Sequence, residues 1–160
     1  MSAVQHAETT ITAPDGQAWF EIIREFDAPP ARVFAAHVNP ALVARWLGPA
    51  DLEFHIDVWD AQTGGSWAYS SGRGDDVFEF YGSFHEIRDG ERIVQTFTWR
   101  GAPDAVALGI ATFEALPDGR TRLVNRSVGA SAEERDAHLA GGMEAGVVEG
   151  YAKLDDLLVD

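Results

Sequence analysis

The residues of this chain that could do chemistry are few, and histidine is the first type to consider. His85 and Glu86 begin like the zinc-protease motif H-E-x-x-H, in which two histidines bind zinc and the glutamate is the general base. Asp89 stands where the second histidine is needed, and the surrounding residues alternate like a strand. The five histidines, at positions 6, 37, 55, 85 and 138, show no metal-ligand spacing. The sequence therefore predicts no metal site.

The sequence also contains no clear motif for a catalytic nucleophile or for a phosphate-binding loop. The chain has no cysteine and no G-x-S-x-G turn that would expose a serine. The stretch Gly72-Arg73-Gly74 is too short to cradle a phosphate, and acidic residues follow it. We therefore expect no cofactor and name no catalytic residue.

Composition limits the classes of partner. At 160 residues, with 46% hydrophobic and 11% aromatic residues, the chain is expected to fold as one domain with a sizeable core. Its net charge of −14 disfavours nucleic acid and anionic membranes, which need basic patches. With no cysteine, no signal peptide and no apolar run long enough for a membrane span, we expect a soluble cytoplasmic protein.

The element most able to position a site is a helix predicted over residues 131–158. Ser131 and Glu134 form a capping box, and apolar side chains then recur every three or four residues. Gly142, Gly146 and Gly150 lie along one edge of that apolar stripe, although glycine in a helix costs about 1 kcal/mol relative to alanine. Two explanations stay open: the helix packs closely against a strand, or it leaves room for a ligand.

The rest of the chain reads mainly as strands. Residues 1–16 form a loose lead-in, and residues 17–160 form a single domain that begins with a strand at 17–26. Two short helices follow, the second beginning at Asn39-Pro40, and then six strands with turn-length connections. Strands joined in this way form an antiparallel meander, giving an α+β fold with about seven strands. Because such a sheet curves, the C-terminal helix is expected to fill its concave face.

This order of elements, with its motifs, resembles the START-like (SRPBCC) superfamily. Within it, the chain is most similar to the homologues of the activator of the 90-kDa heat-shock protein ATPase. The likeness covers about residues 17 to 158. The pieces that carry it are Ala28-Pro29-Pro30-Ala31-Arg32-Val33-Phe34, Asn39-Pro40, Trp46-Leu47-Gly48-Pro49, Gly64-Gly65-Ser66-Trp67, Gly82-Ser83-Phe84-His85-Glu86-Ile87, Glu91-Arg92-Ile93-Val94, Thr121-Arg122-Leu123 and Gly142-Met143-Glu144. The resemblance implies a helix-grip fold with a cavity between the long helix and the sheet.

Strand alternation then gives a candidate ligand site. Large apolar side chains are predicted on the face turned toward the helix, with the amides of Gln95 and Asn125 among them. Ordinary core packing is the alternative for each residue, and a bulge near Gly82 would exchange the two faces. The predicted ligand residues are Trp46 near one mouth, Phe54, Ile56, Trp67, Tyr69, Phe80, Phe84, Gln95, Phe97, Trp99, Phe113, Asn125, Met143, Gly146, Val147 and Tyr151.

Three functions compete at this stage. The first is a binding protein for a small hydrophobic or aromatic molecule. The second is a protein-interaction module linked to a chaperone, with a packed interior and an exposed apolar patch. The third is an enzyme of the cyclase, aromatase or hydrolase kind, which needs an acid or base in the pocket. If the strand faces were exchanged, that group could be Glu79, Tyr81, Asp57 or His55. A homodimer through a sheet edge is also plausible.

Overall fold

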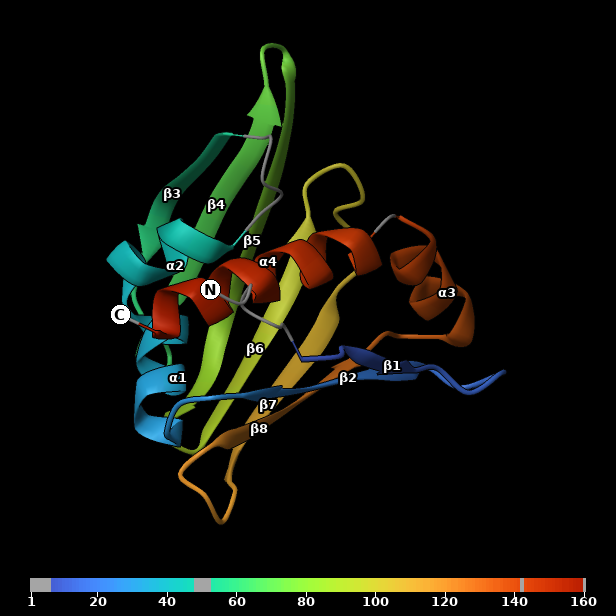
Figure 1. Cartoon of the computed structure of the whole chain (residues 1–160). Coiled ribbons are helices and arrows are strands. Elements are labelled where there is room, and N and C mark those ends of the chain that lie inside the picture. The colour runs from blue at the N-terminus through green and yellow to red at the C-terminus, as the bar shows by residue number, and fades with distance from the viewer. Residues whose placement is uncertain (1–6, 48–52, 142, 160) are drawn as a thin grey trace.

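Eight antiparallel strands form one curved sheet in the computed structural model, which describes residues 7–47, 53–141 and 143–159 (Figure 1). The strands are β1 (Thr10–Thr12), β2 (Trp19–Phe26), β3 (Glu53–Trp59), β4 (Ser66–Arg73), β5 (Asp76–Arg88), β6 (Arg92–Trp99), β7 (Ala107–Ala115) and β8 (Thr121–Val128). Their order in the sheet is β1-β2-β8-β7-β6-β5-β4-β3. Strands β3 to β8 are therefore the predicted meander, and β2 pairs with its last strand.

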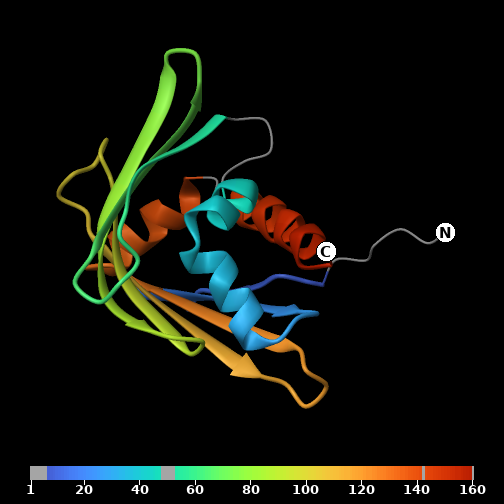
Figure 2. The ribbon, with the colours of Figure 1, turned by 90° about the vertical axis from the view of Figure 1, so that its left-hand side faces the viewer.

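The helices all lie on one side of this sheet, which curves around them (Figure 2). They are α1 (Pro30–Val38), α2 (Pro40–Trp46), α3 (Ala132–Ala140) and α4 (Met143–Leu158). We call the face of the sheet that is turned toward them the inner face. The α+β helix-grip architecture predicted from the sequence is thus confirmed.

The two short helices begin where proline permits. Pro30 and Pro40 each stand in a first helical turn, where a missing N–H costs no hydrogen bond. Asn39 caps α2 by accepting a hydrogen bond from the N–H of Ala41 at 3.0 Å. The predicted helix start at Asn39-Pro40 is confirmed.

The prediction of one continuous helix over residues 131–158 is wrong, because α3 ends at Ala140, with Gly141 as its C-cap, and α4 begins at Met143. The predicted cap is present, since Ser131 Oγ accepts a hydrogen bond from the N–H of Glu134 at 3.1 Å. Two glycines in succession, at 141 and 142, are the weakest point of the predicted helix. Helices α3 and α4 follow different directions (Figure 1). Gly142 itself lies outside the described residues.

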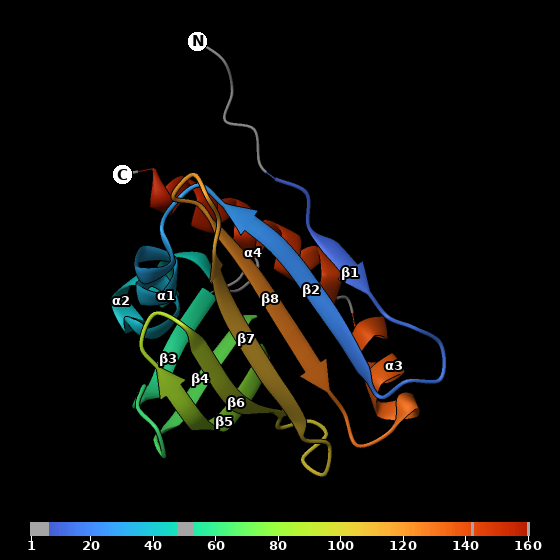
Figure 3. The same ribbon diagram turned by 90° about the horizontal axis from the view of Figure 1, so that it is seen from below.

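The structure also has an eighth strand where the sequence predicted a loose lead-in. Strand β1 pairs with β2 at one border of the sheet, with Ile11 opposite Ile22, whereas β3 forms the other border (Figure 3). Its three residues, Thr-Ile-Thr, are β-branched, but three residues are too few to show an alternation. The partner strand supplies the missing stabilisation.

Helix α4 is held to the rest of the fold by different contacts at different positions. Gly150 is buried against α2, and a Cβ at this position would lie 3.3 Å from the carbonyl oxygen of Trp46. Close packing therefore explains the glycine at 150. At Gly146 a Cβ would meet no atom of the described residues within 4 Å, so close packing does not explain the glycine there.

Candidate functional site

The candidate site is the part of the inner face that lies under α3 and α4. Strand alternation places Trp67, Phe84 and Phe113 on this face, and all three are nearly fully buried in the core. The sequence suggested a possible bulge near Gly82. The pairing of β5 with β6 instead shifts its register later in β5, between Phe84 and Glu86. The shift therefore leaves the aromatic residues before it on the inner face.

Four aromatic rings from β4, β5 and β6 form a continuous layer on the inner face. The ring centroids of Trp67 and Tyr69 are 5.2 Å apart, those of Tyr69 and Phe80 5.4 Å, and those of Phe80 and Phe97 5.3 Å. Phe97 also lies 5.8 Å from Trp67, which closes the group. We call these four residues the aromatic layer. Trp67 is buried, whereas the other three keep part of their surface exposed although they lie on the covered face.

Gly82 lets the strands approach closely inside this layer. A Cβ on Gly82 would lie 2.0 Å from the carbonyl oxygen of Thr96 and 2.7 Å from Nε1 of Trp67. No side chain fits there, and the predicted bend at Gly82 is thus a place of close strand contact. Nε1 of Trp67 is buried and has no hydrogen-bond partner among the described residues.

The aromatic layer continues to an exposed rim beyond the helices. Phe54 lies 5.0 Å from Tyr69, and Ile56 stands opposite Tyr69 in the β3–β4 pairing. Trp99 was predicted under the helix, but 43% of it is exposed, and its ring lies 6.3 Å from that of the equally exposed Phe78. Figure 2 shows the β4–β5 hairpin reaching past the helices, which explains the exposure of this rim.

Polar side chains lie beside the aromatic layer on the same face. Gln95 stands opposite Gly109 on β7, and Gly109 stands opposite Ser127 on β8. Gln95 and Ser127 are half-buried, and neither side chain makes a hydrogen bond to any residue that the structure describes. Unpaired polar groups on a covered face are uncommon, because buried polar groups normally find partners.

Asn125, the other predicted amide, has a partner on α4. Burial raises the pKa of Tyr151 to about 12, and a hydrogen bond from Asn125 and the charge of Arg24 partly oppose this rise. Tyr151 also packs its ring on Phe26 and Trp46, with centroids 5.3 and 6.0 Å apart. These residues therefore belong to the packed end of the interior.

Trp46 and Phe113 lie at that packed end as well. Trp46 is buried, and its indole N–H donates to the carbonyl oxygen of Ala36 at 2.8 Å. His37 packs edge-on against both Trp46 and Phe113, at 4.9 and 5.1 Å. Trp46 thus lies in the core, whereas the sequence predicted it near one mouth of the cavity.

The helix side of the aromatic layer is more loosely occupied. Met143 and Val147 pack against the core but stay partly exposed. Gly146 lies between them on α4 and has open space where a side chain would extend. Side chains therefore pack closely around Tyr151, whereas the Cβ position of Gly146 meets no described atom within 4 Å.

Sequence reasoning missed His138, because it considered histidine only as a metal ligand or, at His55, as an acid or base. The imidazole of His138 on α3 stacks on Phe97 at 5.6 Å and meets Phe20 edge-on at 5.4 Å. Burial lowers the pKa of His138 below its usual value. No pattern along residues 132–140 marked this position, because the contact depends on how α3 lies over the sheet.

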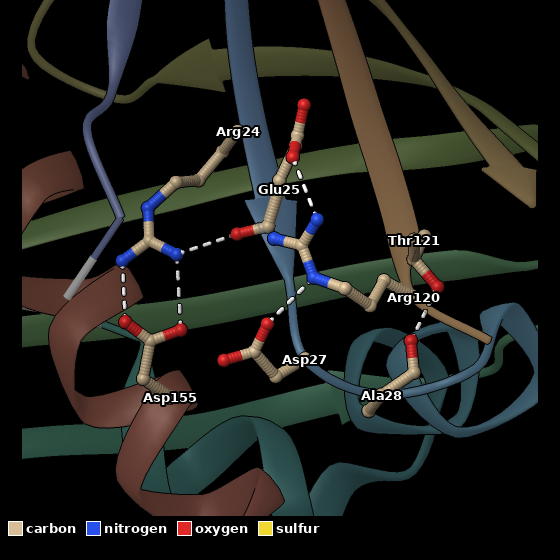
Figure 4. Close-up of polar contacts among 7 residues, drawn as sticks. All are labelled: Arg24, Glu25, Asp27, Ala28, Arg120, Thr121 and Asp155. Atoms are coloured by element: carbon tan, nitrogen blue, oxygen red, sulfur yellow. Dashed lines mark hydrogen bonds and ion pairs between the residues drawn. The ribbon is translucent and has the colours of Figure 1, made fainter. Parts of the chain in front are cut away.

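Sequence reasoning also missed a buried ion pair that joins β2 to α4. Arg24 is 2% exposed, and its Nη1 and Nη2 donate to the two carboxylate oxygens of Asp155 at 2.9 and 2.5 Å (Figure 4). The signal was an arginine at the inward position of an alternating strand, between Ile22 and Phe26. The pair leaves this part of the inner face without a net charge.

The residues of the enzyme alternative do not reach the inner face. Glu79 and Tyr81 alternate with Phe80 and meet Arg100, which lies 3.7 Å from the Glu79 carboxylate and over the Tyr81 ring. His55 and Asp57 are exposed and pair with each other at 3.2 Å. No cluster of three metal-binding side chains occurs within residues 7–47, 53–141 and 143–159.

Two hollows in the described surface lie away from the aromatic layer, near the C-terminal end of α4. One of about 170 Å³ is lined by Arg32, Ala36, Leu42, Arg45, Leu157 and Leu158. The other, of about 310 Å³, is lined by Arg45, Lys153, Asp156 and Leu157. Neither contains a predicted ligand residue. Within the described part of the chain, no helix combines the length and apolar character needed to cross a lipid bilayer.

Comparison with known proteins places the fold among solved structures. A protein from Mycobacterium smegmatis superposes with a TM-score of 0.84 at 21% identity, over 94% of this chain and 97% of the other. A Rhodobacter sphaeroides protein superposes with a TM-score of 0.83 at 24% identity, over 94% of this chain and 99% of the other. The AHSA1 protein from Silicibacter pomeroyi superposes with a TM-score of 0.71 at 21% identity, over 89% of this chain and 98% of the other. At these identities the likeness shows the fold.

The sequence itself matches one protein-family model. Residues 27–159 match the model described as activator of Hsp90 ATPase homolog 1-like protein. Among curated proteins, none matches the sequence of this chain.

Proposed function

The chain belongs to the family of activator of Hsp90 ATPase homolog 1-like proteins, and we propose that it binds a small hydrophobic or aromatic molecule. The proposed place is the inner face between α4 and the aromatic layer, and the proposed compartment is the cytoplasm. One observation carries the proposal: aromatic rings, and the amide of Gln95, which has no hydrogen-bond partner among the described residues, stay partly exposed on the face that the helices cover. A fully packed core would bury the rings and pair the amide.

The chemistry of this face suits such a ligand. Ligand sites are usually lined by apolar and aromatic side chains, with a few polar groups that fix orientation. Tyr69 and Phe80 present adjacent rings, against which a flat ligand can stack or pack edge-on, whereas His138 covers one face of the neighbouring Phe97. The open space at Gly146 supplies room from the helix side. The exposed rim at Phe78 and Trp99 offers an apolar route of entry.

A variant that fills the space at Gly146 tests the proposal. We expect the neutral fluorescent probe N-phenyl-1-naphthylamine to bind saturably to the wild type and to lose at least about tenfold in affinity for Gly146→Leu. The replacement removes a helical glycine, and a Cβ at this position meets no described atom within 4 Å, so stability should be kept or raised by up to about 1 kcal/mol.

The matched control is Val148→Leu, because Val148 is a 47% exposed residue of the same helix. Its probe affinity should stay within about twofold of wild type, since small changes on an exposed surface are nearly neutral. Equal probe binding by wild type and a folded Gly146→Leu variant would refute the proposed site.

A chaperone-linked interaction module is the second candidate, and the exposed rim favours it. Phe78 and Trp99 are 45% and 43% exposed, and their ring centroids lie 6.3 Å apart. Contiguous exposed apolar side chains are typical of protein-binding surfaces. Under this proposal, Phe78→Ser with Trp99→Ser should abolish binding to a purified 90-kDa heat-shock protein, while Gly146→Leu should not. Binding unaffected by the double replacement would contradict this candidate.

A homodimer through a sheet edge is a further proposal about assembly. Strands β1 and β3 are the two borders of the sheet, and a border strand presents unpaired backbone groups. Sedimentation equilibrium decides this directly: a single species of 17.4 kDa at high concentration would exclude the dimer.

A further inference from the structure

Resting on the proposed function, we propose that the ligand is an uncharged aromatic molecule with a hydrogen-bonding group, such as a phenol or a carboxamide. Its ring would lie on the aromatic layer, and its polar group would lie over Gly109 between Gln95 and Ser127. The selectivity for an uncharged polar end comes from these three residues and from the charges around them.

The register of the sheet creates a polar slot. Gln95, Gly109 and Ser127 stand side by side on β6, β7 and β8, all on the inner face. Adjacent strands lie about 4.8 Å apart, so Gln95 and Ser127 flank a gap of roughly 10 Å between their backbones. A Cβ on Gly109 would meet only atoms of Gln95, at 3.6 and 3.8 Å, among the described residues. The missing side chain leaves space between two polar ones.

The two polar side chains are available to a ligand. Neither makes a hydrogen bond within the described part of the chain. An amide and a hydroxyl each donate and accept, which matches a phenol or carboxamide better than a group that only accepts. Since Phe84 stands opposite Gln95 and Phe20 opposite Ser127, apolar rings border the slot on both sides. A ligand that reached the slot with an apolar group would leave both polar side chains unpaired.

The titratable and charged groups that face this region are neutral or compensated. Arg24 on β2 is held by both carboxylate oxygens of Asp155 on α4. Burial lowers the pKa of His138 on α3, which keeps its imidazole neutral at pH 7. Burial also raises the pKa values of Tyr69 on β4 and Tyr151 on α4, which keeps both phenols protonated. An ionised ligand would therefore be desolvated here without an opposite charge, which disfavours it.

Three ligands with one ring system test the inference: 2-naphthol, naphthalene and 2-naphthoate, each competed against N-phenyl-1-naphthylamine at pH 7. At this pH 2-naphthol is uncharged and 2-naphthoate is an anion. We expect 2-naphthol to bind about tenfold more tightly than naphthalene, as one or two net hydrogen bonds provide. We expect 2-naphthoate to bind more weakly than both.

Variants then connect the preference to the slot. Gln95→Leu should bring the affinity for 2-naphthol down to that for naphthalene. Gln95→Met should have the same effect, and its unbranched side chain resembles glutamine in shape. The matched control Gln17→Leu, at an exposed loop position, should keep the full preference. Circular dichroism confirms that each variant is folded before its affinities are compared.

Each outcome separates the inference from the proposed function. If 2-naphthol and naphthalene bind the wild type equally, or the folded Gln95 variants keep the preference, the polar slot is wrong while the binding site stands. If 2-naphthoate binds most tightly, the preference for an uncharged ligand is wrong. If no ligand displaces the probe and Gly146→Leu binds the probe like wild type, the site itself fails, and the inference fails with it.

Discussion

At the scale of single residues, the interior keeps two histidines neutral by burying them beside aromatic rings. His37 has its pKa lowered to about 4 by burial, and the hydrogen bond from its Nδ1 to the carbonyl oxygen of Val33, at 2.8 Å, only partly offsets this. His138 shows the same direction on α3. Both imidazoles therefore pack as neutral aromatic rings in the core.

The buried His37 predicts a loss of stability in weak acid. Below its usual pKa of 6.5, the unfolded chain binds a proton that the folded chain refuses until about pH 4. The free energy of unfolding should therefore fall as pH is lowered through this window, by about 2 kcal/mol between pH 7 and pH 5. Urea unfolding of wild type and His37→Gln at both pH values measures it, and the variant should lose about 2 kcal/mol less.

The control for this prediction is His55→Gln, because the side chain of His55 is 76% exposed. This variant should lose as much stability as wild type between the two pH values. A wild type and His37→Gln with equal pH dependence would show that His37 does not resist protonation in the folded protein.

At the scale of elements, the ion pair of Arg24 and Asp155 fixes α4 over β2 (Figure 4). Removing only the acid leaves the 2% exposed guanidinium without its partner. We expect Asp155→Ala to lower the free energy of unfolding by about 3–5 kcal/mol, measured by urea denaturation. The neighbouring exposed residue gives the control, since Asp156→Ala should cost less than about 1 kcal/mol.

A second comparison separates the cost of an unpaired charge from the worth of the pair. The double variant Arg24→Met with Asp155→Leu should recover most of the stability that Asp155→Ala loses, because a buried pair replaced by apolar groups is often neutral. A loss below about 1 kcal/mol in Asp155→Ala would contradict the account of a buried clamp.

The elements also show what sequence patterns could and could not predict. Alternation of apolar and polar residues placed Trp67, Phe80 and Phe97 on the inner face, because a strand has a period of two that packing preserves. The helical period, in contrast, ran through residues 140–142, whereas α3 ends at Ala140 and α4 begins at Met143. Periodicity records which side chains are apolar, and it does not record where the backbone stops being regular.

Long-range partners explain the rest of the difference. Strand β1 exists because β2 lies beside it, and the bidentate pair joins residues that are far apart in sequence, 24 and 155. His138 became part of the inner surface because α3 turned it onto Phe97. Such contacts depend on the folded arrangement, so a pattern read along one segment could not predict them.

At the scale of the whole molecule, the sheet is larger than the helices that cover it. The interior is closely packed where α1, α2 and the C-terminal half of α4 meet, around Trp46 and Tyr151. Toward the β4–β5 hairpin, the sheet extends past the helices (Figure 2), and Phe78 and Trp99 of the rim are exposed. One end of the fold therefore stabilises the domain, and we propose that the other end holds the ligand.

Native mass spectrometry of freshly purified wild-type protein and Gly146→Leu tests this claim most directly. The account predicts that the wild type carries a small molecule that leaves on mild activation, and that Gly146→Leu, purified in the same way, carries none. After solvent stripping, the wild type should take up one equivalent of added 2-naphthol and the variant should not. A wild type that carries nothing and takes up no more 2-naphthol than Gly146→Leu would contradict the account.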